Sequence, residues 1–526
     1  MDGCSEKRVA VIAGGGPAGL TMAYELAHRS ETIQPIVYEA SDMLGGISRT
    51  VDHNGNRIDI GGHRFFSKNA RVRARWNEIM PMQGSPARDE LLWGVSAPKH
   101  TSWATDPEQS DEVMLLRRRI SRIYYLRRFF DYPVTLSLRT LRSMGFFRSM
   151  RSAAGFIASK FRKLPDTTLE NFYINRFGKP LYRMFFEGYT EKVWGVHPSR
   201  LGADWGAQRI KGLSISAILR DMFVKKLGIS RTRKVETSLI EEFAYPKFGP
   251  GQLWELTAKR AAESGAEIVV SSRVEKVHIG RSGRVEAVSV VTKDGKMKRT
   301  DCDMFISSMP LCDLIKALDG IDVPEEVRRI AKELPYRDFI TVGLLVPELR
   351  IKNHSEFKTV NERIPDTWIY VQERDVRLGR IQVFNNWSPY MVKDFENTVW
   401  IGLEYFCSEG DEMWNMSDSD FIEMAKRELE HVGMINASDV LDAVRIKVRK
   451  AYPSYFGSYY ELGKVKAFLN SIPNLYCIGR NGQHRYNNMD HSMLTAMVAA
   501  DNILNGITDK DNVWNVNTEK EYHESE

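Results

Sequence analysis

The sequence predicts an α/β fold that contains a Rossmann-type dinucleotide-binding domain, and three observations support this prediction. A short apolar strand runs into a glycine-rich turn and a helical pattern near the start of the chain, and a second β-type run ends at an acidic residue. Hydrophobic residues make up 43% and charged residues 27% of the 526 residues, which excludes a disordered or collagen-like chain. At about 150 residues per domain, two to four folding units are expected.

The first element is the strand, turn and helix at the start of the chain. The strand leads into Gly14, Gly16 and Gly19, which have GxGxxG spacing. These glycines let the backbone turn and approach a pyrophosphate, and the following helix presents free N–H groups to it. The next β-type run, 36–38, ends at Glu39, whose carboxylate would bind a ribose hydroxyl. The whole unit predicts a dinucleotide site.

Two glycine doublets follow the acidic residue. Gly45 and Gly46 come shortly after it, and Gly61 and Gly62 precede His63. Small residues at the second doublet would let the chain pass close to a flat ring. The first doublet resembles the one that follows the ribose acid in FAD enzymes of the amine oxidase and protoporphyrinogen oxidase superfamily. This resemblance implies FAD, bound non-covalently, as the cofactor.

Four separated stretches narrow the resemblance to UDP-galactopyranose mutase, a flavoenzyme of the same superfamily. They are GGHRFFS at 61–67, GKPLYRMFFEGYTEKVWGVHPSRL at 178–201, YPKFGPG at 245–251 and GRNGQHRYNNMD at 479–490. Positions that match the family pattern are His63, Lys192, Trp194, Arg480, Arg485, Tyr486 and Met489. Positions that depart from it are Phe66, Val193, His484 and Asn488.

The resemblance implies an FAD-binding domain assembled from discontinuous segments, residues 1–75, 235–310 and 470–508. Strands are expected within 268–277, 303–308 and 475–479, and a helix is expected from about 492 to 504. The remainder would form an α+β substrate domain with a helical insertion. Its helical and lid part would be 76–234, its β-rich part 311–469. Residues 509–526 hold six acids against two lysines and are expected to form a frayed tail.

The same resemblance implies a reaction and a set of site residues. In the mutase, N5 of the reduced flavin attacks the anomeric carbon of a nucleotide-linked sugar, and no net oxidation occurs. The residues expected to bind the cofactor are Gly14, Gly16, Pro17, Ala18, Gly19, Glu39, Gly45, Gly46, Gly61, Gly62, His63, Val274, Gly479, Arg480 and Met489. The residues expected to be catalytic are His63, Trp194, Arg480 and Tyr486. The residues expected to bind substrate are Tyr189, Lys192, Trp194, Arg209, His484, Arg485, Tyr486 and Asn488.

The resemblance implies a mutase that acts on a nucleotide-linked or polyprenyl-linked sugar. Two other functional classes remain possible. One is an FAD oxidase or dehydrogenase that removes hydride from its substrate, and the other is a flavin-bound interaction protein without activity. NAD(P)H is a candidate reductant for the flavin. We find no HExxH motif, carboxylate pair or Ser/His/Asp order, so the sequence predicts no metal site and no hydrolase.

The location of the protein is predicted from its cysteines and apolar runs. Five cysteines occur without a CxxC pair, which favours a reducing compartment over a disulfide framework. We expect neither a membrane span nor a signal peptide, because no apolar run is long enough. A cytoplasmic protein is therefore predicted.

One basic segment sets the sign of the net charge, which is +6. Residues 117–163 carry thirteen Lys or Arg against a single acid, Asp131. A solvated basic face, attraction of an anionic substrate, and peripheral docking on the anionic inner leaflet of a membrane are the interpretations. Nucleic acid is not expected as a partner, because no nucleic-acid-binding module accompanies the segment. The oligomeric state is left open.

Overall fold

Five parallel strands from three distant stretches of the chain form the sheet that follows the glycine-rich turn. The computed structural model describes residues 7–93, 105–132, 138–203, 242–355 and 357–516. Their order in the sheet is β20-β13-β1-β2-β9. The strands are β1 (Arg8–Ala13), β2 (Ile33–Tyr38), β9 (Glu267–Val269), β13 (Met304–Ser307) and β20 (Leu475–Cys477). The predicted α/β fold class, with a parallel sheet of the FAD-binding type, is thus confirmed, while the exact domain boundaries stay a prediction.

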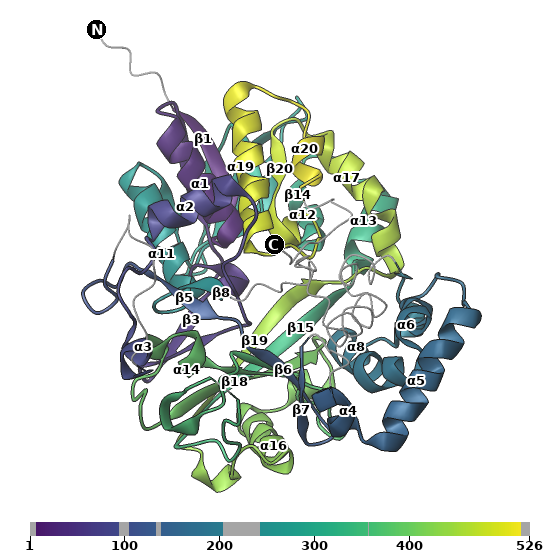
Figure 1. Cartoon of the computed structure of the whole chain (residues 1–526). Helices are drawn as coiled ribbons and strands as arrows, with labels where there is room; N and C mark the ends of the chain where they lie inside the picture. The colour runs from purple at the N-terminus through teal and green to yellow at the C-terminus, as the bar shows by residue number, and fades with distance from the viewer. Residues whose placement is uncertain (1–6, 94–104, 133–137, 204–241, 356, 517–526) are drawn as a thin grey trace, which may run out of the picture.

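Helices cover this parallel sheet, and small side chains set how closely they pack. Figure 1 shows the N-terminal and C-terminal segments side by side in this layer. Helix α1 contributes Ala18 and Ala23 to a buried cluster that also contains Ala496 and Ala500 of helix α19. The short alanine side chains allow the helix backbones to approach each other. The helices are α1 (Pro17–Arg29), α11 (Pro250–Glu263) and α19 (Met489–Asn505).

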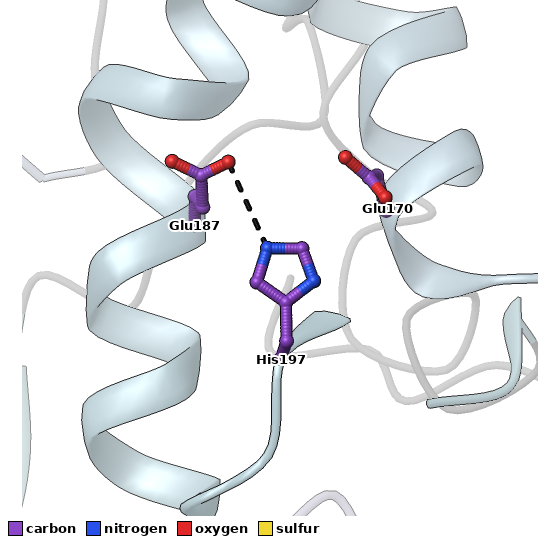
Figure 2. Close-up of side chains that lie close together, drawn as sticks. All are labelled: Glu170, Glu187 and His197. Carbon is purple, nitrogen blue, oxygen red and sulfur yellow. Dashed lines mark ion pairs between the residues drawn. The ribbon is translucent and has the colours of Figure 1, made fainter. Parts of the chain in front are cut away.

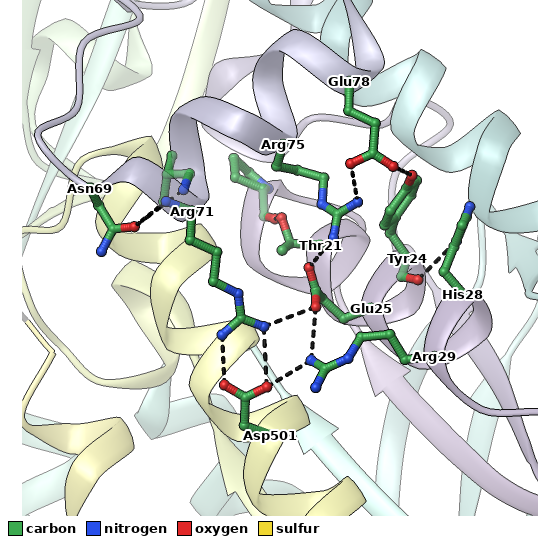
Figure 3. Close-up of polar contacts among 12 residues, drawn as sticks. Thr21, Tyr24, Glu25, His28, Arg29, Asn69, Arg71, Arg75, Glu78 and Asp501 are labelled. Carbon is green, nitrogen blue, oxygen red and sulfur yellow. Dashed lines mark hydrogen bonds and ion pairs between the residues drawn. The ribbon is translucent and has the colours of Figure 1, made fainter.

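A network of ion pairs joins α1 and α19 to helix α2 (Ala70–Ile79). The carboxylate of Glu25, whose side chain is 1% exposed, accepts hydrogen bonds from Arg29, Arg71 and Arg75 at 2.7–3.0 Å. Asp501 on α19 accepts from the first two of these arginines. Figure 3 shows the network between the three helices. Because Glu25 is buried and has three cationic partners, its charge is compensated within the fold.

Two further sheets complete the strand framework. A four-stranded sheet contains, in order, β12 (Met297–Asp301), β11 (Val285–Val291), β10 (Arg273–Ile279) and β14 (Leu318–Asp319). A seven-stranded sheet contains, in order, β19 (Asp442–Pro453), β15 (Tyr336–Val346), β18 (Val399–Cys407), β17 (Arg380–Val383), β16 (Trp368–Val371), β6 (Ser121–Tyr125) and β7 (Arg128–Asp131). Two small antiparallel pairs are β3 (Thr50–His53) with β4 (Asn56–Asp59), and β5 (Met114–Arg118) with β8 (Glu242–Pro246).

One layer of helices lies beside the seven-stranded sheet, and the other helices are distributed around both large sheets. The layer consists of α4 (Leu138–Met144), α5 (Phe146–Phe161), α6 (Leu169–Phe177), α7 (Lys179–Tyr182), a π-helical turn at Arg183–Glu187 and α8 (Gly188–Trp194). The other helices are α3 (Arg88–Trp93), α12 (Leu311–Ala317), α13 (Glu325–Glu333), α14 (Phe384–Trp387), α15 (Glu412–Asn415), α16 (Asp418–His431), α17 (Leu462–Asn470), α18 (Gly479–Gly482) and α20 (Asp511–Trp514).

The start of the basic segment is a β-hairpin, although the sequence analysis placed it in the helical and lid part, 76–234. Strands β6 and β7 pair in antiparallel register, and both turn residues, Leu126 and Arg127, have positive φ. Such a turn is usually marked by Asn or Gly, so its sequence signal is absent here. Part of the charge is also internal, because buried Arg117 pairs with Asp89 and Arg122 pairs with Asp366.

The structure also describes two segments near the ends of the predicted parts. Within the helical and lid part, the stretch 80–112 contributes to the core, since Met80 and Gln83 are buried and it includes α3; residues 94–104 lie outside the described range. The end of the chain is not frayed from residue 509, because α20 buries Val513 and Trp514. The indole N–H of Trp514 donates to Asn470 at 2.9 Å. Burial of an aromatic ring outweighs the repulsion among the neighbouring acids.

Candidate active site

A cavity of about 1120 Å³ extends from the carboxyl ends of the parallel strands to the seven-stranded sheet. At one end, residues that follow strands of the parallel sheet line it, among them Gly14, Glu39 and Ser308. At the other end, Tyr370 and Tyr452 from the seven-stranded sheet line it. Ligands of open parallel sheets bind at this strand edge, so the cavity lies where the nucleotide motif predicts.

The glycine-rich turn is shaped by backbone contacts that exclude larger side chains. Gly14 has φ of +106°, and a Cβ there would lie 2.2 Å from Oγ of Ser308. A Cβ on Gly19 would lie 1.9 Å from the carbonyl oxygen of Gly14, so this glycine allows helix α1 to start against the turn. Gly16, Pro17 and Ala18 line the cavity, whereas Gly19 acts behind it.

Glu39 at the end of β2 anchors the turn from the opposite side. Its carboxylate accepts from the backbone N–H of Gly15 at 2.7 Å and from the N–H and hydroxyl of Ser41 at 2.8 Å. Val274 on β10 also lines the cavity near this end. The carboxylate lines the cavity and is held by three donors, which is the position expected for contact with a ribose.

The first glycine doublet meets the turn directly. The N–H of Gly45 donates to the carbonyl of Gly15. The backbones of Gly16 and Gly46 lie so close together that a Cβ on either glycine would contact Cα of the other. Arg49 follows and lines the cavity, where burial lowers the pKa of its guanidinium. The two glycine segments therefore enclose one narrow channel with a cation beside it.

His63 stands at the point where the nucleotide end of the cavity meets the aromatic end. Its Nδ1 donates to the carbonyl of Gly61 at 2.7 Å, so the neutral ring keeps Nε2 as an acceptor. Burial lowers the pKa of His63 to about 4, and the charge of Arg480 contributes to this effect. A Cβ on Gly62 would lie 2.7 Å from the ring of Trp368, so only glycine fits there. His63 is therefore a neutral group at neutral pH.

The residues around this channel fit a flavin dinucleotide. The channel offers free backbone at the start of helix α1, a ribose-binding carboxylate and glycines that admit a flat ring. Among the described residues, the Nε atoms of Arg49 and Arg480 are buried and have no hydrogen-bond partner. Buried guanidinium donors of this kind are normally satisfied, and phosphate or flavin oxygens would satisfy them.

Aromatic side chains form the opposite end of the cavity. Trp194 is 3% exposed and meets Tyr452 edge to face, and Tyr452 stacks on Tyr486 with ring centroids 5.8 Å apart. The guanidinium of Arg480 lies 4.2 Å from the ring centroid of Tyr486 and 5.1 Å from that of Tyr452. The structure thus brings together Trp194, Arg480 and Tyr486, three residues that the sequence singled out.

Arg380 is a central residue of this wall that the sequence did not reveal. Its Nε donates to the hydroxyl of Tyr189 at 2.8 Å, and its Nη1 pairs with buried Glu404 at 3.1 Å. Its guanidinium also faces the ring of Trp368 at 5.1 Å. Arg380 stands in an ordinary apolar strand with no motif around it, so only the pairing of β17 with β18 could reveal its role. The aromatic-rich run around Tyr452 was a usable signal that the sequence interpretation passed over.

The start of helix α19 closes the cavity beside the flavin channel. Arg485, Asn488 and Met489 line the cavity, and Asn488 occupies the N-cap position of the helix. Gly479 lines it as well, and a Cβ there would lie 2.8 Å from that of Ala18. The positive end of the α19 dipole therefore lies at the cavity wall, where an anionic group is favoured.

Two predicted substrate residues lie away from the cavity. The amine of Lys192 donates to the backbone carbonyls of Val371, Glu373 and Leu378 at 2.8–3.3 Å, and burial lowers its pKa to about 8. His484 is fully buried, and its Nε2 donates to the carbonyl of Ser454 at 3.2 Å. Both side chains stabilise the loops that carry the cavity wall, since the amine of Lys192 and Nε2 of His484 donate to backbone carbonyls.

Arg209, the remaining predicted substrate residue, lies outside the described residues. Several cations that the sequence interpretation did not select line the cavity. They are Arg64, Arg119, Arg273, Lys447 and Arg449.

A cluster of possible metal-ligating groups lies among the helices of the substrate side. The ligand atoms of Glu170, Glu187 and His197 are within 4.8 Å of one another (Figure 2). Glu187 also accepts from Arg374 at 3.2 Å, and Nδ1 of His197 accepts from the N–H of Ser199. Glu187 and His197 therefore have protein partners, and the cluster is assigned no metal.

Several solved structures share this architecture. A crystal structure of reduced UDP-galactopyranose mutase aligns with a TM-score of 0.75 and 21% identity, over 97% of this chain and 98% of that chain. A protein assigned as a protoporphyrinogen oxidase from Exiguobacterium sp. 255-15 aligns with a TM-score of 0.63 and 16% identity, over 95% and 99% of the chains. A putrescine oxidase bound to putrescine aligns with a TM-score of 0.56 and 13% identity, over 95% and 99%. These likenesses show a shared fold.

A family model provides the assignment. The model for flavin containing amine oxidoreductases matches residues 17–504, which include every strand of the parallel sheet except β1. None of the helices in the described ranges is long and apolar enough to cross a bilayer. Since the match extends over most of the sequence, the chain belongs to the flavin-containing amine oxidoreductase family.

Proposed function

We propose that this FAD-dependent enzyme acts on a nucleotide-linked sugar, in the manner of a UDP-galactopyranose mutase. The observation that carries the proposal is the charge of the cavity. Among the described residues, nine Arg or Lys and nine Tyr side chains line it, against two acids, Glu39 and Asp490. Guanidinium and phenol groups are the donors that bind a diphosphate. Glu39 belongs to the nucleotide end, so the aromatic end is strongly cationic.

The cationic wall argues against an amine substrate. A protonated amine would be repelled by Arg380, Arg480 and Arg485 at the aromatic end, whereas an anion would be attracted there. Although the chain belongs to the amine oxidoreductase family, its cavity therefore favours an anionic substrate over a cationic amine. The second candidate is an oxidase or dehydrogenase that removes hydride from an anionic substrate, which the family membership supports.

The side chains around the cavity would hold the substrate in a defined way. FAD, when bound, would supply either a nucleophilic reduced N5 or an oxidised ring that accepts hydride. Burial raises the pKa of Tyr189, so its hydroxyl stays protonated. Because the oxygen of this hydroxyl accepts from Arg380, its hydrogen remains available to a substrate oxygen. Trp194 would pack against a sugar or base, and Arg480 would pair with the diphosphate.

The experiment compares the two reactions in one purified holoprotein. The flavin is reduced with dithionite or NADPH without oxygen, candidate UDP-sugars are added, and products are separated by chromatography. Turnover that requires reduced flavin and yields an isomer supports the mutase proposal. Hydrogen peroxide release in air, or flavin bleaching by substrate alone, would assign the oxidoreductase instead. Arg480→Gln should raise KM for the UDP-sugar by roughly tenfold or more, whereas Arg284→Gln, an exposed residue outside the cavity, should not.

A further inference from the structure

Helix α5 carries its large apolar side chains on the outside of the molecule. Phe146, Phe147 and Phe161 are 73%, 86% and 84% exposed, and Met150 and Ile157 are each 58% exposed. We call these five residues the outer face of α5. The positions 146, 150, 157 and 161 recur at helical spacing, so the side chains form one continuous stripe. An isolated exposed apolar residue is ordinary, but a whole exposed helix face is not.

The inner face of α5 consists of small and polar residues. Ser152 and Ser159 are buried, and Gly155 contacts the neighbouring helix α7. A Cβ on Gly155 would lie 2.4 Å from Pro180, and a Cβ on Gly178 would lie 2.6 Å from the backbone of Gly155. The amphipathic pattern of this helix is therefore inverted relative to a normal surface helix, in which the apolar stripe faces the core.

Basic residues border the outer face. Arg151 is exposed and follows the apolar stripe on one side of the helix, Lys160 is exposed on the other side, and exposed Arg162 directly follows the last turn. The sequence contains no Asp or Glu between residues 132 and 165. A helix with an apolar stripe and a basic border is the pattern of segments that lie in the interface of an anionic bilayer.

The position of α5 suits such a contact. Figure 1 shows α5 at the edge of the molecule, on the outer side of α6 and α8. Helices α6 and α7 pack directly against α5, and they supply Tyr173, Phe177 and Leu181 to the wall of the cavity. A surface that binds the outer face would therefore lie one helix layer from the cavity.

We propose that the outer face of α5 docks the protein on an anionic membrane surface. The apolar stripe would enter the acyl boundary, and Arg151, Lys160 and Arg162 would contact lipid phosphates. A second copy fits this face less well, because a symmetric contact would bring the same basic borders together without any acid to neutralise them. The inference does not depend on the proposed substrate, and its test uses none.

The test measures binding of the full-length holoprotein to sucrose-loaded vesicles by sedimentation. Vesicles of phosphatidylcholine alone are compared with vesicles that also contain phosphatidylglycerol. We expect binding to the anionic vesicles that weakens as salt is raised. Phe147→Ser combined with Phe161→Ser should reduce this binding by roughly tenfold or more, and Arg151→Gln combined with Lys160→Gln and Arg162→Gln should remove most of its salt dependence.

Matched controls use exposed apolar residues elsewhere on the surface. Met297→Ser and Leu441→Ser replace side chains that are each 60% exposed, and they should leave vesicle binding unchanged. Retained flavin absorbance and circular dichroism would show that each variant is folded. Equal sedimentation with neutral and anionic vesicles, or none with either, would overturn the proposal. Self-association that is abolished by the Phe147 and Phe161 substitutions, without vesicle binding, would assign the face to a second copy and also overturn it.

Discussion

Arg380 illustrates how much one side chain contributes to the aromatic end of the cavity. It pairs with Glu404, which is fully buried, and it fixes the hydroxyl of Tyr189. Burial raises the pKa of Glu404, and the charge of Arg380 opposes that effect. Arg380 therefore has two roles: it compensates the buried charge of Glu404, and it belongs to the proposed substrate-binding wall.

Replacing one member of this pair should separate the two roles. Arg380→Met leaves a buried carboxylate without its cation and should lower the free energy of unfolding by about 3–5 kcal/mol. Adding Glu404→Gln removes the uncompensated charge and should restore most of that loss, measured by chemical denaturation. Affinity for the UDP-sugar should stay low in the double variant. Recovery of both properties would show that Arg380 has no part in binding.

His484 predicts an acid-sensitive component of stability. Burial lowers its pKa to about 4, below its usual value of 6.5, so the unfolded chain takes up a proton in this range while the folded chain does not. Stability should therefore fall as the pH drops from about 6.5 to about 4. At pH 4.5 the loss from this residue should reach about 2 kcal/mol.

The variant His484→Asn checks this prediction. Asparagine suits this position because the backbone φ of His484 is +48°, a left-handed conformation that Asn adopts more readily than most residues. Denaturant midpoints measured between pH 7 and 4.5 should fall less steeply in the variant than in the parent chain. An unchanged pH slope would mean that other groups, such as His63, cause all of the acid sensitivity.

At the scale of elements, the glycine-rich turn has two kinds of glycine. A Cβ on Gly16 would lie 3.7 Å from Cα and 3.9 Å from N of Gly46, both ordinary contacts, whereas a Cβ on Gly19 would overlap a backbone oxygen. The first glycine faces the cavity, and the second sets the distance between helix and strand. The GxGxxG pattern thus combines a binding requirement with a packing requirement.

Alanine substitutions should distinguish these requirements. Gly16→Ala should fold normally but lose most of its flavin, because the methyl group stands where the pyrophosphate is expected. Gly19→Ala should lose flavin and also lower the free energy of unfolding by about 2 kcal/mol or more, since helix α1 must move away from the turn. Flavin absorbance per protein and thermal unfolding by circular dichroism measure the two effects. Equal stability of the two variants would contradict this division.

The β6–β7 hairpin and the outer face of α5 show what sequence patterns leave open at this scale. The hairpin turn uses Leu126 and Arg127 at positive φ, and tertiary pairing with β16 supports that conformation. Apolar periodicity on α5 predicts a helix correctly, but it does not say that the stripe faces outward. Which face is buried depends on the partner helices, and those become adjacent only in the folded chain.

At the scale of the whole molecule, the C-terminal segment completes both the sheet and the cavity. Strand β20 pairs with β13, and the start of α19 lines the cavity. Helix α20 then packs under this segment, where the carbonyl of Val513 accepts from Gln483 at 2.9 Å and the amine of Lys510 donates to Ile472 at 2.6 Å. The chain can form its cofactor site only after nearly all of it has been made.

Two truncations test this dependence. Removing residues 517–526 should leave flavin content and thermal stability unchanged. Removing residues 510–526 deletes buried Val513 and Trp514 and should cost about 3 kcal/mol or more, with partial loss of flavin. Thermal unfolding followed by flavin fluorescence measures both. If the longer deletion is as stable as the full chain, α20 does not support the cavity.

The sequence by itself determined the dinucleotide motif and the α/β class, because strand, turn, helix and acid are local in the chain and their spacing is fixed by backbone geometry. The flavin family followed from the resemblance of its separated motifs. It also selected His63, Trp194, Arg480 and Tyr486, which line one cavity. The tertiary structure alone decided that Lys192 and His484 donate hydrogen bonds to backbone carbonyls and that Arg380 joins the site. Those outcomes depend on strands and loops from distant segments, and side-chain roles there follow from burial and partners rather than from spacing.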